Sequence, residues 1–218
     1  MTPTFRLAAL AALALCAARP ARADWTGTMK MHTEPAEGPG DQQGKISGKA
    51  GKLRMEMEQG KMGKMAMVID LKEQKMTMIM AARHSFMTMD MTQPMMGGHS
   101  APIHVRCETL DVADCLTKQG FKKSGAETVN GTKSDKWEAD RDEPQSGKVH
   151  ETLWIPQGVK GFAMVKQVSK SASRTTTLDV LDFKETSLDD ALFAAPADFT
   201  DMSKGFGPMM GGPGGRPQ

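Results

Sequence analysis

Methionine recurs at every second position in four successive stretches of this chain. In a β-strand, alternate side chains point to the same face of the sheet. Many of the residues between these methionines are polar, for example Glu56, Lys64 and Thr77. The spacing therefore predicts four strands that each carry thioethers on one face. The methionines in question are Met55, Met57, Met65, Met67, Met76, Met78, Met80, Met87, Met89 and Met91.

Methionine also has to supply much of the hydrophobic core. Leu, Ile, Val and Phe together number 35 of 218 residues, which is below the roughly 20% that indicates disorder when the net charge is also high. The net charge here is only +2. The sequence holds 20 methionines, and 13 of them lie between Met55 and Met96. Because methionine is apolar and packs into irregular spaces, it makes a core of ordinary size possible.

Strand and turn signals continue on both sides of this region and predict a mainly β (α+β) protein. Asn130-Gly131 between two alternating stretches is a strong hairpin signal. Short connections of this kind favour an antiparallel sheet, and a sheet of about eleven strands is expected to curl. The strands are expected at residues 25–32, 45–49, 51–58, 64–71, 74–81, 84–91, 121–129, 132–139, 148–155, 161–169 and 174–184.

One helix is predicted over residues 112–119, with Asp111 as its N-cap and Asp114 as the capping-box acid. Cys107 lies before this helix in the sequence, and Cys115 lies within it. On one straight helix they would lie about 12 Å apart, too far to bridge, so a disulfide requires Cys107 in the preceding loop. Two buried free thiols are the alternative. A short helical turn, capped by Ser187, is expected over residues 188–193.

The first 23 residues are predicted to be a cleavable signal peptide. Arg6 precedes an apolar run over residues 7–18, and Ala21-Arg22-Ala23 suits cleavage. A lipid anchor at Cys16 is the alternative. We expect one domain over residues 24–204 and a disordered Gly/Pro/Met tail over residues 205–218. An even number of remaining cysteines fits an oxidising space such as the periplasm.

Net charge limits the classes of partner. The full chain carries +2, and loss of the three arginines of the leader would leave 2 − 3 = −1. A charge near zero argues against nucleic acid and against an anionic membrane surface. No other stretch has the length of a membrane span. We expect a monomer.

The methionine-rich face needs a cover, and three are considered. The helix and facing strands can close it as an ordinary core. An apolar ligand such as an acyl chain can lie on it, since methionine adapts to variable shapes. Thioethers also bind Cu(I) or Ag(I). Sacrificial oxidation of methionine is a further role.

A repeated motif bears on the metal hypothesis. Pro94-Met95-Met96-Gly97-Gly98 recurs as Pro208-Met209-Met210-Gly211-Gly212. It can be a lid over the apolar face, a chance repeat, or a soft-metal site. The candidate ligands for that site are Met95, Met96, His99, Met209 and Met210, with His104 nearby.

Four segments resemble a family of exported bacterial proteins that is known as a domain of unknown function. They are residues 65–80, 115–131, 148–155 and 186–196. The chain is more distantly similar to LolA/LolB-type periplasmic lipoprotein carriers, in the strand-Asp-turn-strand unit over residues 68–76 and in the ending Leu188-Asp189 to Phe193 to Pro196. This resemblance implies an unclosed half-barrel of about eleven antiparallel strands with a lid over an apolar cavity. The carriers begin with a long helix, whereas this chain begins with a strand at Trp25.

The sequence does not indicate an enzyme. His150-Glu151 lacks a second histidine at the zinc-protease spacing, and there is no nucleophile elbow, P-loop or dinucleotide-binding glycine motif. Acidic residues are expected on strand exteriors and turns. We therefore expect no catalytic residue and no cofactor, and a binding or carrier protein is the main hypothesis.

Overall fold

The computed structural model describes residues 24–35, 41–60, 63–91, 107, 111–143 and 147–203. The predicted leader over 1–23 with Cys16, the tail over 205–218, and Met95, Met96, His99, His104, Met209 and Met210 lie outside the described residues. Within the described ranges, no helix is long and apolar enough to cross a lipid bilayer.

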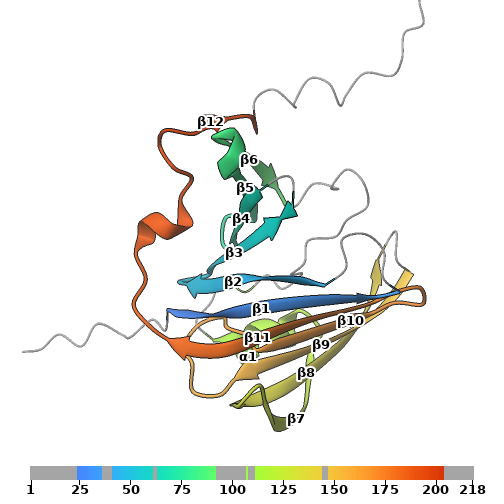
Figure 1. Cartoon of the computed structure of the whole chain (residues 1–218). Coiled ribbons are helices and arrows are strands. Elements are labelled where there is room, and N and C mark those ends of the chain that lie inside the picture. The colour runs from blue at the N-terminus through green and yellow to red at the C-terminus, as the bar shows by residue number, and fades with distance from the viewer. Residues whose placement is uncertain are drawn as a thin grey trace, which may run out of the picture.

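Twelve described strands form one sheet, in the order β12-β6-β5-β4-β3-β2-β1-β11-β10-β9-β8-β7 (Figure 1). All pairs are antiparallel except β12 with β6. The strands are β1 (Trp25–Glu34), β2 (Gln42–Lys49), β3 (Lys52–Gln59), β4 (Gly63–Asp70), β5 (Lys75–Met80), β6 (Ser85–Asp90), β7 (Lys122–Val129), β8 (Thr132–Glu143), β9 (Gly147–Pro156), β10 (Lys166–Lys170), β11 (Thr175–Glu185) and β12 (Thr200–Asp201). Two 3-10 helices, η2 (Ala81–Arg83) and η3 (Asp190–Phe193), accompany them.

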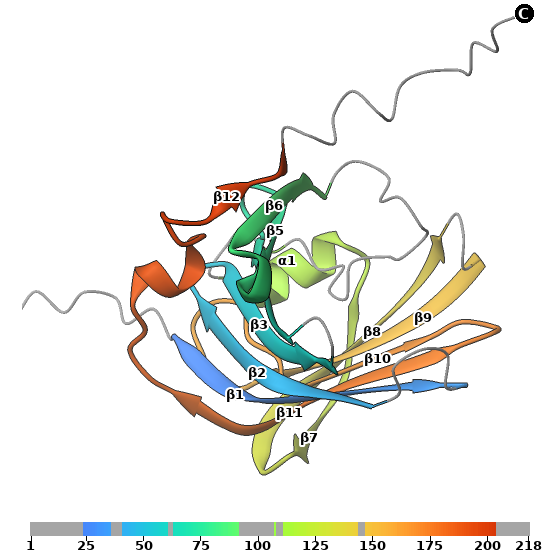
Figure 2. The same ribbon diagram turned by 45° about the horizontal axis from the view of Figure 1, so that its top comes forward.

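The sheet curls around the single described α-helix, α1 (Val112–Lys118), without closing into a barrel (Figure 2). The expected unclosed half-barrel with one main helix is therefore confirmed, with twelve strands where about eleven were predicted. β1 begins at Trp25, directly after the first described residue, as expected.

The large core lies on the inner face of the curl. Leu116 and Cys115 of α1 pack in one cluster with Trp25, Met29 and Ile46 from β1 and β2. The same cluster continues through β3 and β9. Burial of these apolar side chains, at about 25 cal/mol per Å² removed from water, holds the helix against the sheet.

A smaller core lies on the outer face of β3–β6. Ala66, Val68 and Ile79 of the strands pack with Phe193 of η3, so the C-terminal segment covers this face (Figure 1). Arg54 on β3 donates a hydrogen bond to the carbonyl of Leu192 at 2.9 Å. Strands β3–β6 are thus covered on their outer face by a segment about 120 residues further along the chain.

Two local predictions were wrong. The strand expected over 161–169 begins at Lys166 as β10, after Gly161 with its φ of +90° and a buried segment over residues 162–165. Only the end of that segment approaches the ladder: the Val165 amide donates to the Trp154 carbonyl at 2.9 Å, and the Val165 carbonyl accepts from the Val180 amide at 2.8 Å. The final helical turn is capped by Asp189, whose carboxylate accepts from the Ala191 amide at 3.0 Å, and not by Ser187.

Candidate ligand-binding face

The ten methionines predicted to share a face do so by register. Met55 lies opposite Met67, Met67 opposite Met78, and Met78 opposite Met87 across β3–β6. Residues directly opposite in an antiparallel pair point to the same side. A second row joins Met57, Met65 and Met80, and a third joins Met76 and Met89. Met91 continues the β6 series. We call this surface, on the inner side of β3–β6, the methionine face.

Burial of the methionines differs from position to position, and in the rows through Met55 and Met76 it decreases toward β6. Ile46 on β2 is fully buried, and Met55 on β3 and Met76 on β5 are 1% and 3% exposed. The other eight methionines of the face are only partly buried. Four of them (Met57, Met67, Met89 and Met91) pack against the large core. The methionine face is therefore core at one end and partly open at the other.

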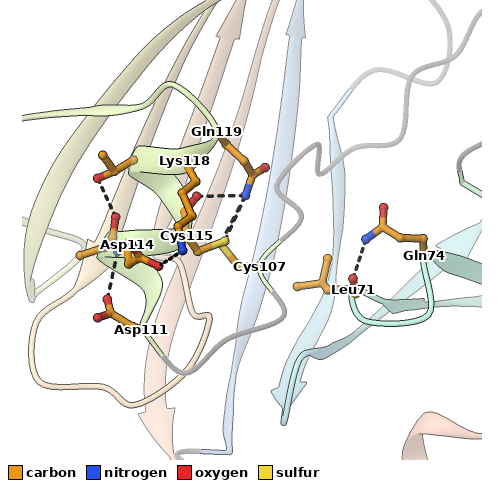
Figure 3. Close-up of a disulfide and its surroundings, with 10 residues drawn as sticks. Leu71, Gln74, Cys107, Asp111, Asp114, Cys115, Lys118 and Gln119 are labelled. Atoms are coloured by element: carbon orange, nitrogen blue, oxygen red, sulfur yellow. Dashed lines mark hydrogen bonds and ion pairs between the residues drawn. A yellow bond between two sulfur atoms is a disulfide. The ribbon is translucent and has the colours of Figure 1, made fainter.

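The helix that covers the inner side is fixed by a disulfide. Cys107 and Cys115 are bonded, with their Cα atoms 5.6 Å apart. Cys107 lies before α1, as the predicted bridge required, and both cysteines belong to the large core. The amide of Gln119 points toward the two sulfur atoms, 3.1 Å from that of Cys115 (Figure 3).

The N-terminus of α1 has the expected cap. The Asp111 carboxylate accepts a hydrogen bond from the Asp114 amide at 3.0 Å, and Gly120 after the helix has a φ of +84°. Lys118 forms an ion pair with Asp114 at 2.6 Å. Capping and the disulfide together fix where Leu116 meets the sheet.

A buried polar group that sequence reasoning missed lies on the inner face of the other half of the sheet. Glu151 on β9 is 1% exposed, although it was expected on a strand exterior. Its Oε2 lies 3.3 Å from Arg141 Nε, and Gln167 Nε2 donates to its Oε1 at 2.8 Å. The Arg141 guanidinium also lies 4.8 Å from the Phe121 ring centre. Nothing in the HE dipeptide distinguished this inward position from a solvated one.

The described histidines hold no metal cluster. Within the described ranges, no group of three His, Cys, Asp or Glu residues could hold an ion. His150 lies on β9, as expected, and its Nδ1 lies 2.8 Å from Asp140. Hydrogen bonds to Asp41 and Glu34 raise the pKa of His32, which is exposed at the end of β1. These are surface pairs, which stabilise a protein little.

A hollow of about 520 Å³ lies near the ends of β8, β9 and β10, away from the strands of the methionine face. Its lining is largely charged and includes Asp140, Arg141, Asp142, Lys148, Val149, His150, Lys170 and Ser171. A lining of this kind suits water and polar groups better than an apolar chain.

Comparison with known proteins gives a likeness of fold only. No protein-family model and no curated protein matches the chain. The PNGF-II structure is 13% identical with a TM-score of 0.47, and the alignment covers 83% of this chain and 31% of that one, so this chain spans under a third of its length. A LolA superfamily protein from Nitrosomonas europaea is 12% identical with a TM-score of 0.43, over 80% and 91% of the two chains.

The lipoprotein LppX of Mycobacterium tuberculosis is 10% identical with a TM-score of 0.38, over 76% of this chain and 89% of that one. LolA-superfamily and lipoprotein structures are thus among the similar proteins, as the sequence resemblance predicted. The class defined here is an unclosed half-barrel of antiparallel strands with one helix on its inner side. At these identities no function is carried over from the similar proteins.

Proposed function

We propose that this chain is a binding or carrier protein that shelters an apolar ligand, such as a lipid acyl chain, on its methionine face. The observation that carries the proposal is the combination of register and burial. Ten thioether side chains share one side of β3–β6, and eight of them are only partly buried. Apolar side chains that gather on one side of a sheet and stay incompletely buried are a candidate surface for an apolar ligand.

Methionine suits this use. Its side chain is unbranched and has three rotatable bonds, so neighbouring methionines can repack around chains of different length. Full burial of one such side chain is worth on the order of 1.5–3 kcal/mol. A partly buried methionine contributes only part of this free energy to folding. The remainder is available to ligand binding, because a ligand that covers the side chain removes the rest of its surface from water.

The chemistry required is burial alone, so we propose no enzymatic step. The disulfide between Cys107 and Cys115 supports an exported location, because such bonds persist in oxidising compartments. We place the protein in the periplasm, where an apolar molecule in transit needs shelter from water.

Native mass spectrometry tests for a ligand directly. Protein purified gently from the periplasm, without detergent, should carry an additional mass that organic extraction identifies as a lipid or an acylated peptide. A single unliganded mass, together with no binding of a fluorescent fatty-acid analogue, would exclude the proposal.

A pair of charge substitutions tests the face. Met65 is on the methionine face, and the adjacent Lys64 is exposed on the opposite side of β4. Met65→Glu should weaken binding of the fluorescent fatty acid by about tenfold or more, because a carboxylate resists burial against an acyl chain. Lys64→Glu introduces the same side chain one residue away and should leave the affinity unchanged. Equal affinities of the two variants would place the ligand elsewhere.

A further inference from the structure

Four methionines form the open end of the methionine face. Met65 on β4, Met78 and Met80 on β5, and Met87 on β6 are all partly buried. Unlike the other methionines of the face, these four belong to neither hydrophobic cluster of the described residues. We call them the methionine patch.

The register brings the four thioethers together. Met65 lies opposite Met80, and Met78 lies opposite Met87. Opposite residues in an antiparallel pair have Cβ atoms about 4.5–5.5 Å apart, and Met78 and Met80, two residues apart on one strand, are separated by about 7 Å. A methionine sulfur lies two bonds beyond Cβ on a flexible chain. Sulfur atoms from three adjacent strands can therefore converge on one point above β5.

The surroundings contain almost no other donor. On the inner side of β4–β6 the remaining described positions are glycine, isoleucine, methionine and one serine. That serine, Ser85, lies opposite Met80 and is buried. The carboxylates Asp70 and Asp90 lie at positions of opposite parity, on the other side of the sheet. The patch therefore offers thioether sulfur without carboxylate or imidazole.

We propose that the methionine patch is a binding site for a soft monovalent cation, Cu(I) or Ag(I). Thioethers are soft ligands that favour Cu(I), whereas Zn²⁺, Ca²⁺ and Mg²⁺ require thiolate, imidazole or oxygen donors. In the proposed site, any three of the four thioethers of the methionine patch coordinate the ion. Binding involves no change in the oxidation state of the ion or of sulfur. The site differs from the one that sequence reasoning placed on Met95, Met96, His99, Met209 and Met210.

Thiols do not compete within the described residues. Cys107 and Cys115 are joined in the disulfide, so neither is a thiolate ligand. Cys16 is the third cysteine of the chain, and a Cys16→Ser background removes it from the measurement.

The binding experiment is an anaerobic Cu(I) titration of the full-length Cys16→Ser chain against bathocuproine disulfonate. One Cu(I) should be withdrawn from the chelator. The variant Met65→Leu/Met78→Leu/Met80→Leu/Met87→Leu removes the sulfur and keeps an apolar side chain. It should lose about 100-fold or more in affinity, because loss of an outer partner of a metal site already costs roughly 10–100-fold and this variant removes the ligands themselves. Unchanged affinity in this variant would overturn the proposal.

A matched control separates the two possible methionine sites. Met95→Leu/Met96→Leu/Met209→Leu/Met210→Leu carries the same number of the same substitution and should bind Cu(I) as the parent chain does. Loss of binding in this variant, with binding kept in the patch variant, would assign the ion to the repeated motif and overturn the proposal.

A second measurement needs no variant. Ag(I) bound to the wild-type chain should protect Met65, Met78, Met80 and Met87 from oxidation by dilute peroxide, as mapped by peptide mass spectrometry. Met202 is 41% exposed and should oxidise at the same rate with and without Ag(I). Equal oxidation of the four patch methionines with and without the ion would contradict the site even if the leucine variant did not fold.

The outcome is independent of the apolar ligand. Leucine preserves hydrophobic contact, so the patch variant should still bind the fluorescent fatty acid while it loses Cu(I). Loss of fatty-acid binding in Met65→Glu concerns the carrier proposal alone, and loss of Cu(I) in the leucine variant concerns the cation site alone.

Discussion

Trp25 shows how a single residue joins distant parts of this fold. Its side chain is fully buried, and the indole N–H donates to the carbonyl of Phe162 at 3.2 Å. On the neighbouring strand, Gly48 lies opposite Trp25, and a Cβ at Gly48 would lie 2.2 Å from the indole nitrogen. Glycine is therefore needed at position 48 because the ring occupies the space of its side chain.

Gly48→Ala should lower the free energy of unfolding by about 1–3 kcal/mol, the usual cost of overfilling a packed core. Gly125→Ala on β7 is the matched control. No atom lies within 4 Å of a Cβ at that position, so its effect should be within about 0.5 kcal/mol. Urea denaturation of both variants measures the difference, and equal midpoints would contradict the close contact.

The helix α1 shows what the disulfide contributes at the scale of an element. With seven residues, it is too short to be stable alone in water. It keeps its place through Leu116, which is fully buried, and through the bond from Cys115 to Cys107. The bond joins residues that are eight apart in the sequence. It stabilises the fold mainly because it lowers the conformational entropy of the unfolded chain.

Cys107→Ala/Cys115→Ala should lower the free energy of unfolding by about 2–3 kcal/mol, from the loop-closure entropy of a bridge of this length. Reduction of the wild-type protein with dithiothreitol should give a similar loss while both sulfur atoms remain, which separates the crosslink from the packing of the side chains. A wild-type midpoint in urea that does not move on reduction would show that the bond contributes no stability.

Elements with a local signal could be predicted from sequence, whereas those defined by distant partners could not. The two-residue period of Met76, Met78 and Met80 marked β5, and Asp111 marked the start of α1. The run over residues 162–165 looked like a strand because it is continuously apolar, but residues 162–164 pack in the large core, where the Phe162 carbonyl accepts from the indole of Trp25, and the strand begins only at Lys166. β12 has two residues and no period, so only its pairing with β6 defines it.

The candidate site was predictable to the same extent. Alternation assigned the ten methionines to one side of their strands, and the hairpin order of β3–β6 aligned them in rows. Which of the ten methionines pack against the large core was not predictable, because that depends on the elements that face the sheet from elsewhere in the chain. The inward position of Glu151 depends likewise on the partners Arg141 and Gln167.

At the scale of the whole molecule, strands β3–β6 have different covers on their two sides. The outer side packs against the C-terminal segment through Phe193, which is 7% exposed, with Val68 and Ile79 beneath it. The inner side carries the methionine patch on β4–β6, whose four side chains are partly buried and belong to neither cluster. If the inner side were a closed core, its side chains would contribute to the free energy of unfolding as much as those of the outer side. If it is a binding face, its side chains contribute little to the stability of the ligand-free protein.

Truncation of one side chain on each side distinguishes these two cases. Phe193→Ala should lower the free energy of unfolding by about 3 kcal/mol or more, because it removes a buried aromatic side chain. Met80→Ala on the inner side should cost about 1 kcal/mol or less, because the side chain is partly exposed and outside both clusters.

Met202→Ala, at an exposed position, is the control for loss of a methionine and should have no measurable effect. Chemical denaturation of ligand-free protein measures all three variants. If Met80→Ala proved as costly as Phe193→Ala, the methionine face would be an ordinary closed core, and the space proposed for an apolar ligand would be absent.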